Sequence, residues 1–201
     1  MTKRLGLIVT DASPLITLGA AQALACLIMP EMRVFVPDMV YAEVARDMTK
    51  LGARDIVDWI RQHLGQVEIV PTEVHAEYEA LRAINPNIRS KRRGEQAALE
   101  VLAHEAASDP DLHAILLFED SDIRSREFVR VLPKRAAAFS TGDLLRELEF
   151  AGRIQSSGRI LDEAAARGRN VERQRQAIAG EPARALSREQ LLRRNEPRGG
   201  G

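Results

Sequence analysis

Acidic side chains follow two apolar segments of the sequence, where strands are expected to end. Asp11 comes directly after residues 5–10, and Asp120 and Asp122 come just after residues 113–118. In an open parallel sheet, ligands bind outside the carboxyl ends of the strands, so two neighbouring ends would bring these carboxylates together. Crowded carboxylates repel, and Mg²⁺ or Mn²⁺, which prefer oxygen ligands, relieve that repulsion. The spacing therefore points to a metal site that could turn water into a nucleophile.

Two further acids lie on expected helices. Glu43 lies on an otherwise apolar helix face, and acids are rarely fully buried unless paired. Glu95 begins a helix, where a carboxylate suits the dipole. Each acid also has a structural interpretation: Asp11 could cap the first helix, Glu43 could be a partly exposed flank residue, and the acids after residue 118 could be turn residues.

Strands and helices are expected to alternate along the chain. Short apolar runs predict strands at residues 5–10, 34–36, 67–70, 113–118 and 136–139. Helical spacing predicts helices from Pro14 to about residue 24, after an Asp38 cap, and at residues 53–64, 72–84, 95–107, 141–150 and 160–166. This alternation predicts an α/β sandwich around a central parallel sheet.

Composition limits the setting of the protein. The 201 residues have a net charge of zero, Cys26 is the only cysteine, and no apolar run approaches the roughly 20 residues of a membrane span. We therefore expect a soluble protein of the reducing cytoplasm, with no membrane association. The charge is divided unevenly, since residues 1–150 carry 18 basic and 23 acidic residues and residues 151–201 carry 11 basic and 6 acidic residues.

The charge change suggests two parts, a body at residues 1–150 and a basic, helical, partly disordered extension at residues 151–201. Residues 151–166 should pack on the body. The apolar patches at residues 171–178 and 186–192 should form short helices ordered only by docking. A second protomer is the favoured docking site. The alternatives are docking on the body or on a partner protein, a disordered tail, and pairing of tail arginines with the acids.

The acids also occur in motifs with a recognisable order. These are Asp11-x-Ser13, Pro37-x-x-Val40-x-x-Glu43-Val44, Gly94-Glu95-x-x-Ala98 and Glu119-Asp120. The set resembles the PIN-domain family of nucleases, and is similar to the VapC-type toxins of toxin–antitoxin pairs. The segments Val-Thr-Asp-Ala-Ser-Pro-Leu and Phe-Ser-Thr-Gly-Asp-Leu-Leu are the closest local matches, and the resemblance covers residues 5 to 150.

The resemblance implies a three-layer α/β/α fold and metal-dependent hydrolysis of RNA phosphodiester bonds. It implies that Asp11, Glu43, Glu95 and Asp120 are catalytic. Asp11, Glu95, Asp120 and Asp122 would hold Mg²⁺ or Mn²⁺, with Glu119 competing for the role of the last two. It also suggests an antitoxin partner and a homodimer. The apolar stripe of Ile56, Trp59 and Ile60 is a candidate dimer surface, and the alternative is that it faces the core.

Several polar residues are candidates for binding the substrate. Ser13 could touch a phosphate, and the resemblance assigns a hydroxyl role to Ser140 or Thr141. Arg92 and Arg93, in a basic loop expected at residues 90–94, could bind RNA phosphates, as could the arginines at 124, 126 and 130. A solvated loop is the alternative.

Other classes of protein fit the pattern less well. A haloacid-dehalogenase-type phosphohydrolase needs a second Asp where Ser13 stands, and a receiver domain needs an acidic pair after the first strand. A PIN-like RNA-binding or scaffold protein with weak catalysis is the more serious alternative, and the presence of all four acids argues against it.

Overall fold

The computed structural model describes residues 5–28, 32–90, 92–109, 111–119 and 132–180. Its strands are β1 (Leu5–Thr10), β2 (Arg33–Pro37), β3 (Val67–Val70), β4 (His113–Phe118) and β5 (Ala136–Ser140). Its helices are α1 (Ala12–Ala20), the short 3₁₀ helix η1 (Leu24–Leu27), α2 (Asp38–Ala45), α3 (Ala53–Gln62), α4 (Glu73–Ile84), α5 (Arg93–Ser108), α7 (Thr141–Phe150), α8 (Ser157–Ala166) and α9 (Glu172–Ala179).

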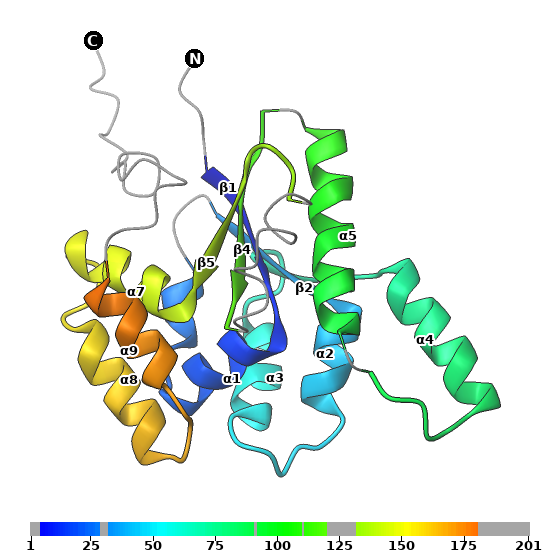
Figure 1. Cartoon of the computed structure of the whole chain (residues 1–201), viewed down its shortest axis with the longest axis horizontal. Coiled ribbons are helices and arrows are strands. Elements are labelled where there is room, and N and C mark those ends of the chain that lie inside the picture. Colours follow the sequence, from blue (N-terminus) through cyan, green and yellow to red (C-terminus); the bar gives the residue numbers. More distant parts are fainter. Residues whose placement is uncertain (1–4, 29–31, 91, 110, 120–131, 181–201) are drawn as a thin grey trace.

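The strands form one parallel sheet in the order β3-β2-β1-β4-β5 (Figure 1). Every residue of β4 is buried, as expected for a central parallel strand that is covered on both faces. The predicted α/β fold, with helices around a central parallel sheet, is confirmed. The strand order reverses between β1 and β4, which places a ligand-binding crevice at their carboxyl ends.

Alternate residues of each strand enter two different cores. Ile8 of β1 packs in a cluster with apolar residues of α1, α7 and α8 on one face of the sheet. Leu7 and Val9 face the other side, where they cluster with Val101 and Leu102 of α5. Figure 1 shows these helices on opposite sides of the sheet. The period-two pattern of the strand thus fixes which helices approach each face.

Several helices begin at residues other than the predicted ones, for reasons of local backbone conformation and capping. Helix α5 begins at Arg93, after Arg92 in a left-handed conformation, so Arg93 lies in the helix and not in the basic loop. Helix α8 begins at Ser157, three residues before the prediction, because the Ser156 side chain accepts a hydrogen bond from the Arg159 amide. Asp38 is the first residue of α2 and not its cap.

The apolar stripe of α3 is part of the intramolecular core. Ile56, Trp59 and Ile60 are only 0%, 7% and 1% exposed, and they pack in the cluster that also contains residues of α1 and α2. The prediction that this stripe offers a dimer surface is therefore wrong. An amphipathic pattern does not distinguish a helix face that meets its own core from one that meets a second chain.

The beginning of the extension packs on the body, as predicted. Leu161 and Ala164 of α8 are fully buried in the same core as α1 and α7. Helix α9 then packs against α7 and α8 of the same chain (Figure 1). The Arg146 guanidinium donates to the Ala177 carbonyl oxygen at 2.6 Å. Docking of this segment on a second protomer was therefore the wrong expectation. Residues 186–192 lie outside the described residues.

None of the helices in the described ranges combines the length and the apolar character that a membrane crossing requires.

We predict that Gly142→Ala releases α9 from α7. A methyl group at residue 142 would overlap the carbonyl oxygen of Gln174, and a backbone atom cannot move aside without shifting α9. Such overpacking typically costs about 1–3 kcal/mol. Hydrogen exchange followed by mass spectrometry should show faster exchange in residues 172–179.

Gly158→Ala in α8 is the matched control, because its methyl group would meet only the Ser156 hydroxyl at an ordinary 3.7 Å. It should leave exchange in α9 unchanged. Wild-type protection of α9 in Gly142→Ala would show that α9 is not held against α7 in this way.

Candidate active site

The candidate site lies where β1 and β4 end side by side. The backbone N–H of Asp11 donates to the carbonyl oxygen of Leu117 at 3.0 Å, so the exits of the two strands are hydrogen-bonded to each other. Asp11 is the first residue after β1, and Glu119 is the first residue after β4. Two acids therefore leave neighbouring strands at the point where the strand order reverses.

Asp11 occupies the N-cap position of α1, but its side chain makes no capping hydrogen bond. Its carboxylate lies instead near the start of α5. A methyl group on Gly94 would lie 3.0 Å from Oδ1 of Asp11 and 3.4 Å from Oε2 of Glu43. Helix capping alone therefore does not explain Asp11, and the structure brings Asp11 and Glu43 to the same side of Gly94.

The electrostatics of Glu43 reflect this crowding. Burial raises the pKa of the Glu43 carboxyl, and the nearby charge of Asp11 raises it further. A hydrogen bond from the Ser90 side chain opposes the rise, as do the charges of Arg46 and Lys50. Glu43 is thus a half-buried carboxyl that holds its proton more firmly than usual, next to a second acid.

Glu95 follows Gly94 in the first turn of α5 and is half-buried. Its helix therefore begins at the glycine that Asp11 and Glu43 approach. Asp120 and Asp122 lie outside the described residues. Convergence of all four predicted catalytic acids stays a prediction, while the juxtaposition of Asp11, Glu43 and the start of α5 is observed.

Glu119 points into a hydrogen-bonded network that the sequence did not reveal. Its side chain is only 6% exposed. The Thr141 hydroxyl donates to Oε1 at 2.6 Å, and the Thr17 hydroxyl donates to Oε2 at 3.0 Å. Burial raises the pKa of Glu119, against the lowering effects of the Thr141 hydrogen bond and the charge of Arg169. In the sequence, the position of Glu119 directly after a fully apolar run was the signal that could have identified it.

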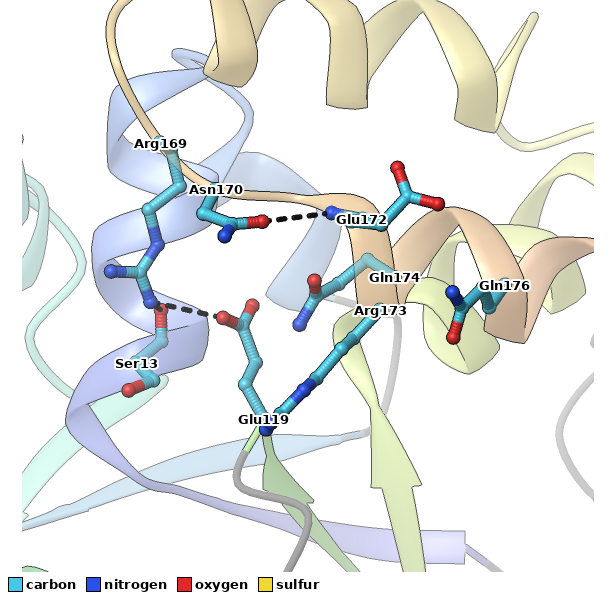
Figure 2. A pocket seen from close by; sticks show the side chains of 8 residues that line it. All are labelled: Ser13, Glu119, Arg169, Asn170, Glu172, Arg173, Gln174 and Gln176. Carbon is cyan, nitrogen blue, oxygen red and sulfur yellow. Dashed lines mark hydrogen bonds and ion pairs between the residues drawn. The ribbon is translucent and has the colours of Figure 1, made fainter.

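Arg169, in the connection between α8 and α9, completes this network (Figure 2). Its Nη2 lies 3.0 Å from Oε2 of Glu119 and 3.3 Å from the carbonyl oxygen of Ser13. Its Nε donates to the Thr17 hydroxyl at 2.8 Å. One of the tail arginines therefore does pair with a strand-end acid. No sequence motif marked this residue, because its partner lies 50 positions away.

The predicted substrate-binding residues have different surroundings. The Ser13 carbonyl oxygen accepts from Arg169, and Thr141 is fully buried against Glu119. Arg92 is exposed at the start of α5. The Arg93 guanidinium lies over the Tyr78 ring, 5.4 Å from its centroid, and 3.8 Å from the Glu77 carboxylate, so in this structure it connects α5 to α4. Arginines 124, 126 and 130 lie outside the described residues.

The donor chemistry of Asp11 and Glu43 suits a hard divalent cation, because both supply carboxylate oxygens and each carboxylate disfavours the charge of the other. Yet no group of three or more His, Cys, Asp or Glu side chains among the described residues is arranged to hold a metal ion. The described acids thus supply only part of the predicted set of ligands.

A family model described as a PIN domain matches residues 7–107, about half of the chain, and the chain belongs to the PIN-domain family. The matched segment runs from β1 into α5, so it contains Asp11, Glu43 and Glu95 and ends before Glu119. PIN domains are generally nucleases, which are hydrolases, and PIN-domain nucleases generally use divalent metals. No curated protein matches the chain.

We predict that Asp11→Asn lowers the pKa of Glu43 in the metal-free protein. Removing the charge of Asp11 removes one of the two effects that raise this pKa, while burial remains. Carbon-detected NMR titration of the Glu43 carboxyl in EDTA measures the change.

Ser90→Ala should shift the same pKa in the opposite direction, because it removes a hydrogen bond that lowers it. An identical Glu43 titration in Asp11→Asn and in the wild type would mean that the two carboxylates do not interact.

Proposed function

We propose that the protein is a metal-dependent endoribonuclease that hydrolyses RNA phosphodiester bonds. Asp11, Glu43, Glu95 and Asp120 are the proposed catalytic acids. Mg²⁺ or Mn²⁺ is the proposed cofactor, held by Asp11, Glu95, Asp120 and Asp122. The observation that supports the proposal best is the approach of Asp11 and Glu43 to Gly94 at the carboxyl edge of a PIN-domain sheet.

The residues have separable tasks in this mechanism. A bound divalent ion would activate water and offset phosphate charge. Asp11 and Glu95 present carboxylate oxygens from two different elements, and the packing of β1 and α5 fixes their positions. Burial and the charge of Asp11 raise the pKa of Glu43, which favours a role in accepting and returning a proton. Gly94 has no side chain, so the space next to the Asp11 and Glu43 carboxylates stays open.

The RNA strand would be held by groups around this edge. Arg92, exposed beside the first turn of α5, is the proposed contact to a phosphate, and such contacts supply affinity without reading sequence. Ser13 is proposed to touch the phosphate from the opposite side, two residues after Asp11. Thr141 would act through Glu119, to which its hydroxyl donates.

The biological setting proposed here follows from the family resemblance. We infer a cytoplasmic toxin of a toxin–antitoxin pair, with an antitoxin protein as partner and a homodimer as the working form. Residues 1–150 would be the nuclease domain, and residues 151–201 an extension. A catalytically weak PIN-like RNA-binding protein is the second candidate, and pairing of Arg169 with a strand-end acid favours it.

We predict that Asp11→Asn removes most metal-dependent RNA cleavage while the fold is kept. The amide has nearly the same shape as the carboxylate but lacks the charge that binds a hard cation. A loss of several kcal/mol of transition-state stabilisation corresponds to about 100-fold or more in rate. Cleavage of a single-stranded RNA, with Mg²⁺, Mn²⁺ or EDTA, measures it on denaturing gels.

Asp55→Asn is the matched control, since Asp55 is an exposed acid in the first turn of α3 and is not one of the proposed site residues. It should cleave like the wild type. Full activity in Asp11→Asn with an unchanged circular dichroism spectrum would refute the mechanism, and a wild type that binds RNA without cleaving it would favour the second candidate.

A further inference from the structure

A cavity of about 610 Å³ lies beside the candidate active site (Figure 2). Ser13 at the start of α1 and Glu119 after β4 form one wall, and Arg173, Gln174 and Gln176 of α9 form another. This volume is within the usual range for sites that bind small molecules, about 300–1,000 Å³. The cavity is bounded by α9, which lies outside the segment that matches the PIN-domain family.

The lining contains a glutamine amide. Gln174 is 3% exposed as a whole residue, and its side chain makes no hydrogen bond within the described part of the chain. Its amide can offer a donor and an acceptor together. Figure 2 shows the Gln174 side chain extending from α9 into the space above Glu119. A ligand with complementary hydrogen-bonding groups would satisfy this amide.

The lining also contains an arginine that has no ion-pair partner among the described residues. Arg169 pairs with Glu119, and Arg175 pairs with Asp162 at 2.6 Å. Arg173 lines the cavity and forms no ion pair with any residue that the structure describes. An arginine in this position is suited to bind a phosphate group.

The remaining lining residues distinguish between kinds of ligand. Glu119, which Arg169 neutralises, and Glu172 also line the cavity, so a bare anion would meet carboxylate charge as well as Arg173. A ligand that carries a phosphate at one end and N–H donors at the other fits both charges. Nucleotides have this chemistry, and unpaired RNA bases are commonly recognised through hydrogen bonds to their edges.

We propose that this cavity binds one nucleotide of the RNA substrate beside the scissile phosphate. Arg173 binds its phosphate, and Gln174 and Gln176 form hydrogen bonds to the edge of the base. This assignment rests on the proposed nuclease function, because the strand would pass from the acids at the sheet edge into the cavity. It gives α9 a role in binding substrate that is separate from catalysis.

The test measures binding of 5′-AMP to the full chain by calorimetry, in EDTA so that no cleavage occurs. AMP is chosen because glutamine amides make paired hydrogen bonds with adenine. Wild-type protein should bind AMP at least about tenfold more tightly than inorganic phosphate, and Arg173→Gln and Gln174→Leu should each weaken AMP binding by about tenfold.

Arg175→Gln is the matched control, because it removes the same charge from the same helix outside the cavity. It should leave AMP affinity unchanged. Since Gln174 is buried and its variant could fail to fold, the exposed Arg173 provides the decisive comparison. Equal losses in Arg173→Gln and Arg175→Gln, or equal affinity for AMP and phosphate, would overturn the assignment.

RNA cleavage by the same preparations separates this inference from the nuclease proposal. If both hold, Arg173→Gln raises KM with little change in kcat. Cleavage by a wild type that binds no AMP would overturn the nucleotide site alone. AMP binding through Arg173 in a protein that cleaves no RNA would refute the nuclease proposal and support the cavity as a nucleotide site.

Discussion

The close approach of two carboxylates to the first turn of α5 is the constraint on which the candidate site depends. Asp11 and Glu43 come from different elements, and both reach Gly94, where a methyl group would lie 3.0 Å from Asp11. The parallel sheet favours this geometry because β1 and β2 are neighbours, so Asp11 after β1 and α2 after β2 leave the sheet at the same edge. Folding therefore brings like charges together, and the pKa of Glu43 is raised by burial first and then by the charge of Asp11.

An arginine of the extension neutralises another acid at the same edge of the sheet. There the strand-end acid is Glu119, and an arginine of the chain itself, together with two threonine hydroxyls, neutralises and binds it. One acid of the edge is thus satisfied within the molecule, while Asp11 and Glu43 still carry a repulsion that a cation would relieve. Glu119 is therefore an acid that stabilises the fold, whereas Asp11 and Glu43 are acids suited to binding a cation.

The sequence predicted the positions of strands and helices more reliably than the contacts that their side chains make. The strand at residues 113–118 was predicted to the residue, because a fully apolar run ends sharply at Glu119. The start of α8 was missed, since it depends on Ser156 and not on the first apolar residue. The sequence left the stripe around Trp59 open between the core and a dimer surface, and it packs in the chain's own core. Arg169 could not be predicted, because its role depends on how α8 turns back toward β4.

The most direct test of the acid site is to locate Mn²⁺ in crystals of the full chain by anomalous diffraction. A bound ion at the carboxyl ends of β1 and β4, coordinated by Asp11 with Glu95 or Glu43, is the predicted result. The peak should disappear in Asp11→Asn crystals, because that variant loses a charged oxygen ligand. No peak at this edge in the wild type, or an unchanged peak in Asp11→Asn, would contradict a metal site built on these acids.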